Sequence, residues 1–220
     1  MPRKVLVAGA TGLVGSEILR GLVADDDVAE VRVLVRRPLD RALVGPKVRE
    51  LVADFEALDA HPEWFRVDQV LCALGTTIRR AGSQEAFRRV DFDYPLALAR
   101  LARAQGARHF LLVSVVGADA RSRLFYNRVK GELEDAVRAL GYAALTVARP
   151  SFLLGPRKEL RLGELVMKRL AYLFPAAWKP VEARQVASAL VRAARAEEPG
   201  VSVLDNVALR LGLADASAKP

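Results

Sequence analysis

A glycine-rich turn follows the first apolar segment of the chain. Residues 4–8 read Lys-Val-Leu-Val-Ala, and the turn opens a stretch with helical spacing that runs to residue 23. In a strand–turn–helix unit, the first glycine permits a tight turn, the second lets a pyrophosphate approach, and the third lets helix and strand pack closely. The turn therefore predicts a dinucleotide site at a helix N-terminus, with an incidental turn as the alternative. The predicted cofactor-binding residues are Gly9, Thr11, Gly12, Leu13, Val14 and Gly15.

Short apolar runs alternate with helical patterns along most of the chain. The predicted strands are 4–8, 31–35, 48–53, 69–74, 109–113 and 143–148, and the predicted helices 12–23, 84–105 and 123–140. This alternation favours an α/β fold, a Rossmann-type doubly wound parallel sheet. We expect one domain over 1–220, with its core in about 1–150 and a small C-terminal substrate cap in 151–220 that includes a helix at 182–196 and a strand at 201–204.

Composition narrows the class of protein. The 220 residues carry a formal charge of +8, but the arginines are scattered among acids, so no nucleic-acid partner is expected. No apolar run approaches the ~18 residues of a bilayer span, and the chain enters its first strand directly, which predicts a cytoplasmic protein without a signal peptide. Cys72, the single cysteine, is expected to be a buried strand residue, with a catalytic thiol as the alternative.

The end of the second predicted strand indicates which dinucleotide is bound. An NAD site usually has an acid there for the ribose 2′-hydroxyl, whereas this chain has Arg36 and Arg37, whose guanidinium groups suit a 2′-phosphate. We therefore expect NADP rather than NAD. The alternatives are that both arginines face solvent, or that Asp40 reaches the ribose.

Two further loops are expected to contact the cofactor. Asp54, followed by Phe55, either accepts from the adenine amino group or caps a helix over 55–60. The next predicted strand is followed by Leu74, Gly75 and Thr76, which are expected to lie against the cofactor. The alternative is an ordinary loop that leads out of the strand.

Three residues form a candidate catalytic group. Tyr126 and Lys130 are four apart on a predicted helix, so the ammonium is expected beside the phenol and should lower its pKa. Ser114 ends the fifth strand, where its hydroxyl would meet a substrate carbonyl. The alternative is a structural serine before an ordinary amphipathic helix.

These motifs occur together with four further segments, 72–77, 90–94, 126–134 and 149–155. In this combination the chain resembles the short-chain dehydrogenase/reductase superfamily, in its extended or atypical branch, and most closely the Tat-interacting-protein-like oxidoreductases. The resemblance implies that Tyr126 handles the proton, that Lys130 binds the nicotinamide ribose, and that Ser114 orients the carbonyl. It also implies that Pro150, Ser151 and Phe152 contact the nicotinamide end. Many members place Asn on the long helix for a proton relay, where this chain has Asp91 and Asp93.

The sequence thus predicts an NADP-dependent oxidoreductase that transfers hydride between nicotinamide and an unidentified carbonyl or alcohol. A catalytically silent NADP-binding regulator or scaffold is the alternative, and recruitment to RNA or membrane is a weaker one. His61 and His109 are expected to be structural, and no metal-ligand spacing is present. The basic stretch 158–179 would be a lid, core packing or a membrane-surface helix. Monomer and homodimer remain open.

Overall fold

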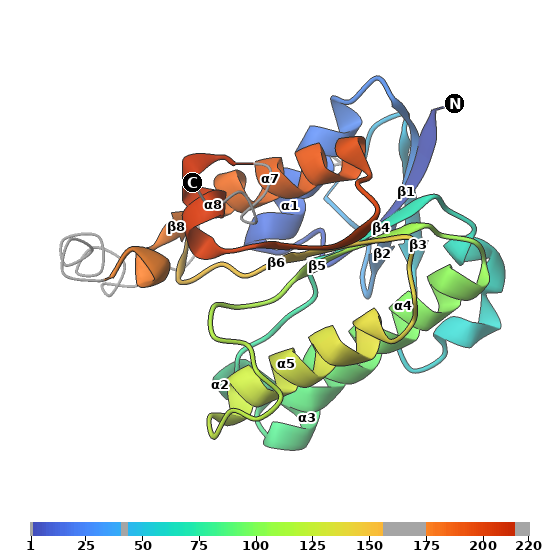
Figure 1. Cartoon of the computed structure of the whole chain (residues 1–220). Helices are drawn as coiled ribbons and strands as arrows, with labels where there is room; N and C mark the ends of the chain where they lie inside the picture. The colour runs from blue at the N-terminus through green and yellow to red at the C-terminus, as the bar shows by residue number, and fades with distance from the viewer. Residues whose placement is uncertain (1, 41–43, 156–174, 214–220) are drawn as a thin grey trace.

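The protein is built on one seven-stranded parallel sheet, seen edge-on in the computed structural model (Figure 1). The structure describes residues 2–40, 44–155 and 175–213. The strand order is β3-β2-β1-β4-β5-β6-β9. The strands are β1 (Arg3–Ala8), β2 (Val28–Val35), β3 (Val48–Val52), β4 (Gln69–Cys72), β5 (His109–Val113), β6 (Ala144–Ala148) and β9 (Gly200–Leu204). The chain reverses its direction of winding between β1 and β4, where ligands of such sheets bind.

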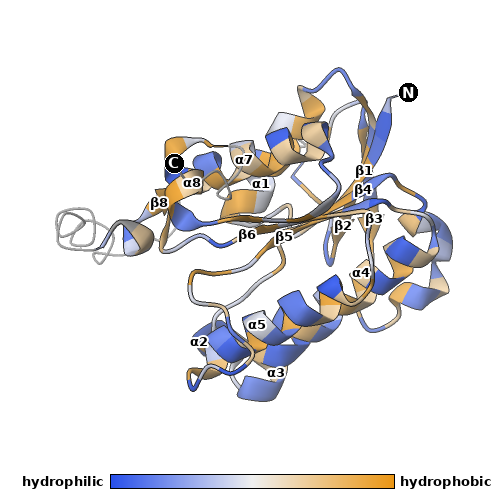
Figure 2. Cartoon of the chain, in the orientation of Figure 1, coloured by the Kyte–Doolittle hydropathy of each residue, from blue (hydrophilic) through white to orange (hydrophobic). Residues whose placement is uncertain are grey.

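Helices cover both faces of the sheet. The first face carries α1 (Leu13–Val23), α7 (Ala183–Ala196) and α8 (Asn206–Leu211), and the second carries α4 (Tyr94–Ala104) and α5 (Phe125–Arg138). Residues alternate along β1, so that Val5 and Val7 pack under the first group while Leu6 and Ala8 pack under the second. Apolar helix surfaces accordingly turn toward the sheet in Figure 2.

Part of the segment expected to form a cap belongs to the sheet layers. β9 pairs in parallel with β6, and α7 packs against α1, where Gly21 lies against Val191. The only further pairing that the described residues add after β6 is a two-residue ladder between β7 (Leu153–Leu154) and β8 (Val181–Glu182). Most of the basic stretch 158–179 lies outside the described residues, so its three interpretations stay predictions.

The helix predicted over 84–105 is interrupted by a wider turn. α3 (Gln84–Arg88) passes into a π-helical turn (Arg89–Asp93) before α4 begins, and a short α2 (Ile78–Ala81) precedes it. A π turn inserts an extra residue, which shifts the side chains that follow around the axis. Asp91 is thereby turned into the interior, where it is fully buried.

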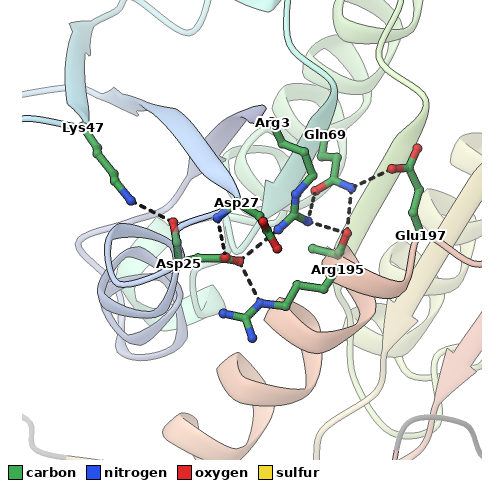
Figure 3. A network of polar contacts seen from close by, with 8 residues as sticks. Arg3, Asp25, Asp27, Lys47, Gln69, Arg195 and Glu197 are labelled. Atoms are coloured by element: carbon green, nitrogen blue, oxygen red, sulfur yellow. Dashed lines mark hydrogen bonds and ion pairs between the residues drawn. The ribbon is translucent and has the colours of Figure 1, made fainter. Parts of the chain in front are cut away.

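A polar network ties the strand N-termini to α7, at the edge opposite the expected site (Figure 3). Asp25 accepts hydrogen bonds from Arg3 at 2.9 Å and from Arg195 at 2.8 Å, and its side chain is 2% exposed. Arg3 and Gln69 both donate to the carbonyl of Ala194, at 2.6 and 2.7 Å. The network therefore fastens the start of the chain to the end of α7.

Candidate functional site

The glycine turn after β1 leaves no room for side chains at two of its three glycines. Gly9 has φ +86°, and a Cβ there would lie 2.5 Å from the carbonyl oxygen of Ala73 at the end of β4. A Cβ on Gly15 would lie 2.1 Å from the carbonyl oxygen of Gly9. At Gly12 the closest atom would be the same oxygen at 3.3 Å. Gly9 and Gly15 are thus required by the fold, whereas Gly12 is exposed at the turn surface.

The N-terminus of α1 fits an anionic ligand. Gly12 is the N-cap and provides no side-chain hydrogen bond, and the first turn holds no acidic residue. The first amides of the helix therefore have no side-chain acceptor, which is the arrangement that binds a pyrophosphate. Thr11 is exposed and Leu13 half-buried beside the turn, whereas the Val14 side chain is buried in the core.

Arg36 and Arg37 lie at the same sheet edge as the glycine turn. In the β1–β2 pairing Ala8 is opposite Leu34, so the two arginines follow directly where β1 enters its turn. Both are exposed, and neither makes an ion pair or hydrogen bond within the described part of the chain. Their guanidinium groups are therefore available to a ligand at that edge.

Asp54 and Phe55 are held by local structure. The Asp54 carboxylate accepts the backbone N–H of Glu56 at 2.9 Å, which closes a turn rather than starting the expected helix over 55–60. The first helical turn there is a 3-10 helix at Leu58–Ala60. The Phe55 ring is buried against Tyr94, so only its backbone can face a ligand.

The loop after β4 is fixed by a single carboxylate. Leu74 and Thr76 are half-buried and Gly75 is exposed. The Thr76 backbone N–H donates to Asp91 Oδ2 at 2.8 Å. The structure thus joins this predicted cofactor loop to Asp91, which the sequence singled out only as a departure from the family pattern.

Tyr126 and Lys130 project from α5 toward the same edge. Gly131 fixes the position of this helix, because a Cβ there would lie 2.2 Å from the Ala120 nitrogen in the loop after β5. Lys130 Nζ lies 2.7 Å from Asp91 Oδ1, and the exposed fractions of their side chains are 4% and 0%. The Tyr126 hydroxyl makes no hydrogen bond within the described residues.

The expected lowering of the Tyr126 pKa is not found. Burial raises the pKa of Tyr126, the positive charge of Lys130 opposes that rise, and Asp91 adds to it. Burial also disfavours the charged form of Lys130, but Asp91 and Tyr126 outweigh this, so the pKa of Lys130 is raised. Both side chains therefore hold their protons at neutral pH.

Ser114 is not joined to Tyr126. Its side chain is buried, and its hydroxyl donates to Glu134 Oε1 at 2.5 Å. Glu134 is fully buried as well and forms an ion pair with Arg149, whose Nη2 lies 2.5 Å from Oε2. The Glu134 carboxylate was not foreseen, because a lone Glu on a helix carries no sequence signal for burial.

The segment after β6 is anchored beside the same edge. The Pro150 carbonyl accepts the Val116 N–H at 2.9 Å. Ser151 donates through its backbone to Asn206 Oδ1 at 2.9 Å and through its hydroxyl to the Lys179 carbonyl at 2.6 Å. The Phe152 side chain is 53% exposed and is free to meet a ligand. Ser151 is thus occupied by structural bonds, and Asn206 is a partner that sequence reasoning missed.

The described residues give little support for a catalytic thiol or a metal site. Cys72 is buried, and burial raises the pKa of its thiol to about 11, so it is not a reactive thiolate. No group of three potential metal ligands occurs in the described ranges. None of the helices within residues 2–40, 44–155 and 175–213 is both long and apolar enough to span a bilayer.

Comparison with known proteins identifies relatives over most of the chain. The sequence profile of the NAD(P)H-binding family matches residues 9–160. The rat protein HTATIP2 is 38% identical over 178 residues, which cover 80% of this chain and 73% of that protein. The mitochondrial protein FMP52 of Candida albicans is 34% identical over 194 residues, which cover 82% of each chain.

The cytoplasmic location expected from the sequence is wrong, since fungal relatives at 33% and 34% identity are named as mitochondrial proteins. Among solved structures, the UDP-glucose 4-epimerase of Thermus thermophilus in complex with NAD has a TM-score of 0.70 at 18% identity, and the match covers 94% of this chain and 81% of that one. This likeness shows the Rossmann fold.

With the glycine turn, the parallel sheet and these relatives together, the chain belongs to the NAD(P)H-binding family, in the atypical short-chain dehydrogenase/reductase-like group that includes HTATIP2 and FMP52.

Proposed function

We propose that the protein is an NADP-dependent oxidoreductase that interconverts a carbonyl compound and its alcohol, with Tyr126 as the proton donor and acceptor. The observation that carries this assignment is the Tyr126 hydroxyl, which has no hydrogen-bond partner among the described residues although its ring is half-buried beside Lys130. A phenol held in this way is available to a substrate oxygen.

The cofactor would lie along the carboxyl edge of the sheet. The uncapped start of α1 would bind the pyrophosphate. Arg36 and Arg37 would hold the 2′-phosphate that distinguishes NADP from NAD, because two exposed guanidinium groups at the end of β2 have no protein partner among the described residues. Asp54, Leu74 and Gly75 would border the adenine and ribose portions.

The nicotinamide end would lie beside α5. Bound NADPH supplies a hydride, so the chain provides binding, orientation and proton transfer. Asp91 engages the Lys130 ammonium, which has three N–H groups, and the remaining ones would bind the ribose hydroxyls. Pro150 and the exposed Phe152 would cover the nicotinamide ring.

The proton step would then use Tyr126 alone. As the substrate carbon gains the hydride, the Tyr126 Oη–H bond breaks and its proton moves to the substrate oxygen, which gives the alcohol. The nearby Lys130 charge stabilises the phenolate that results, and solvent returns the proton. Oxidation of an alcohol runs through the same atoms in reverse.

Ser114 has a different place in this scheme from the one expected. To orient a substrate carbonyl, its hydroxyl would have to release Glu134. We therefore propose that Ser114 is a positioning residue, which ties the end of β5 to α5 and so holds Tyr126 at the edge of the sheet.

The test compares the full chain with Tyr126→Phe. NADPH binding is followed by fluorescence and turnover by NADPH oxidation across a panel of aldehydes and ketones. We expect the variant to bind NADPH normally and to lose about 10²-fold or more in kcat. Tyr94→Phe is the control, because Tyr94 bonds to Glu56, outside the group formed by Tyr126 and Lys130.

Two outcomes would contradict the assignment. Undiminished turnover in Tyr126→Phe would exclude this tyrosine as the proton donor. NADPH binding without turnover of any compound by the unmodified chain would favour the alternative, a regulator or scaffold that uses the cofactor only as a ligand.

A further inference from the structure

One buried carboxylate joins three separate elements at the carboxyl edge of the sheet. Asp91, in the π turn before α4, has no exposed side-chain surface. One of its oxygens lies 2.7 Å from Lys130 Nζ of α5, and the other accepts the Thr76 N–H in the loop after β4 at 2.8 Å. Asp91 therefore connects the helix that carries Tyr126 to the loop expected to border the cofactor.

The packing above this ion pair is close. A Cβ on Gly75 would lie 3.3 Å from Asp91 Oδ1 and 3.8 Å from Lys130 Nζ. The Gly75 backbone thus lies close to the pair, and the absence of a side chain permits this approach.

Among the residues that the structure describes, few charged groups act on Tyr126. Lys130 contributes a positive charge from the same helix, and Asp91 contributes a negative charge from the π turn. Cys72 of β4 is the third titratable group that interacts with this pair, and burial keeps it as a neutral thiol. Because the carboxylate is in direct contact with the ammonium, it offsets much of the field that the ammonium would exert on the phenol.

An amide in place of Asp91 would have a different effect. Asn can accept the Thr76 N–H and fill the same space, but it leaves the Lys130 charge uncompensated. The carboxylate of Asp91 therefore does more than fill space, because it compensates the charge of Lys130. Burial raises the pKa of Tyr126 and Asp91 adds to that effect, in agreement with the geometry.

We propose that Asp91 is a positioning residue that fastens Lys130 to the Gly75–Thr76 loop and, by neutralising its charge, keeps Tyr126 in the phenol form that donates a proton. This inference rests on the proposed function for its catalytic meaning. The site would then be set for carbonyl reduction at neutral and mildly alkaline pH, and alcohol oxidation would need a higher pH.

The experiment measures the ionisation of Tyr126 directly, without substrate. The full chain is labelled at tyrosine ¹³Cζ, the Tyr126 signal is assigned with Tyr126→Phe, and its shift is followed with pH by NMR. In the unmodified chain we expect Tyr126 to remain a phenol up to at least its ordinary pKa of about 10. Ionisation clearly below that pH would overturn the proposal, and the only variant that this part needs is Tyr126→Phe, for the assignment.

Asp91→Asn then isolates the charge. We expect its Tyr126 to ionise at a pH about one unit lower or more than in the unmodified chain. Asp93→Asn is the matched control, since Asp93 lies in the same turn but is exposed, and it should leave the titration unchanged. An unchanged titration in folded Asp91→Asn would overturn the proposal, whether or not turnover is found.

Turnover provides a separate readout. Where a substrate is reduced, the alkaline limb of the kcat/KM profile in Asp91→Asn should move in the same direction as the NMR titration. Absence of turnover in the unmodified chain would contradict the proposed function alone, because the titration of Tyr126 is independent of it.

Discussion

The Ser114 hydroxyl donates to the Glu134 carboxylate, about two helical turns beyond Tyr126 on α5. This bond separates a structural role for Ser114 from a catalytic one. If the serine acts by positioning α5, Ser114→Ala should cost about 1–3 kcal/mol in the free energy of unfolding, because Glu134 loses a partner in the interior. Its kcat/KM should fall less than about 10-fold.

Denaturant unfolding and NADPH oxidation measure the two quantities in the same preparation. A loss of about 10² or more in kcat with unchanged stability would instead mean that Ser114 contacts the reacting oxygen. Ser122→Ala is a suitable control, since Ser122 lies in the loop before α5 and its hydroxyl bonds only to the backbone N–H of Leu124.

Cofactor preference should depend on Arg36 and Arg37. Each charged hydrogen bond to a phosphate contributes about 1.5–3 kcal/mol, so the double alanine variant should bind NADPH at least about 10-fold more weakly and NADH almost unchanged. Fluorescence titration with both dinucleotides measures this. Arg100→Ala, an exposed arginine on α4, controls for the general loss of positive charge. An equal fall in affinity for both cofactors would contradict a 2′-phosphate site.

Alanine variants of two glycines in the first turn should be impaired in different properties, one in stability and the other in cofactor binding. Gly15→Ala would force a methyl group to within 2.1 Å of the Gly9 carbonyl oxygen, so we expect a large loss of stability. Gly12→Ala meets that oxygen only at 3.3 Å and should change the free energy of unfolding by less than about 1 kcal/mol. Its effect should appear in weaker NADPH binding, because the added methyl group lies where the pyrophosphate would approach.

Thermal unfolding with and without NADPH distinguishes the two variants. A Gly12→Ala protein that gains as much stability from NADPH as the unmodified chain would show that the ligand does not approach this turn.

His109 should make the protein sensitive to mild acid. Its side chain is fully buried, Nε2 lies 2.9 Å from Thr146 Oγ1, and burial together with the charge of Arg3 lowers the pKa of its imidazole to about 4. In the unfolded chain this imidazole binds a proton at about pH 6.5, whereas in the folded chain it does so only near pH 4. The free energy of unfolding therefore falls as the pH is lowered from about 6.5 to about 4. The expected fall between pH 7 and pH 5 is about 2 kcal/mol.

Urea unfolding at the two pH values checks this, with His109→Gln expected to lose that part of the pH dependence. The chain has two histidines, and His61 is exposed, so His61→Gln should retain it. The same pH dependence in His109→Gln as in the unmodified chain would assign the acid sensitivity to other groups.

Much of the fold was predictable because local patterns determine it. The glycine turn, the buried strands and the pair Tyr126 and Lys130 all depend on neighbours within a few residues, which the sequence displays. The π turn at Arg89–Asp93 was missed because one extra residue in a helical stretch hardly changes its apolar spacing.

The partners of buried polar groups could not be predicted from the sequence either. Glu134 meets Ser114 and Arg149, and Asp91 meets Lys130, only after separate helices pack on the sheet. The lowering expected for the Tyr126 pKa was wrong chiefly because the phenol is buried, and also because Asp91 adds to the rise. The sequence revealed the nearby cation but neither the burial nor the carboxylate that engages the cation.

The place of β9 beside β6 has a consequence for how the chain acquires its structure. The last strand of the sheet, and the helix that packs on α1, come from residues 183–204, while Arg3 donates to the carbonyl of Ala194. Contacts between such distant points in the sequence close late and slow the search for the native state. A growing polypeptide that ends near Pro150 leaves one sheet edge and the α1 surface bare, so folding should be completed only after synthesis has passed β9.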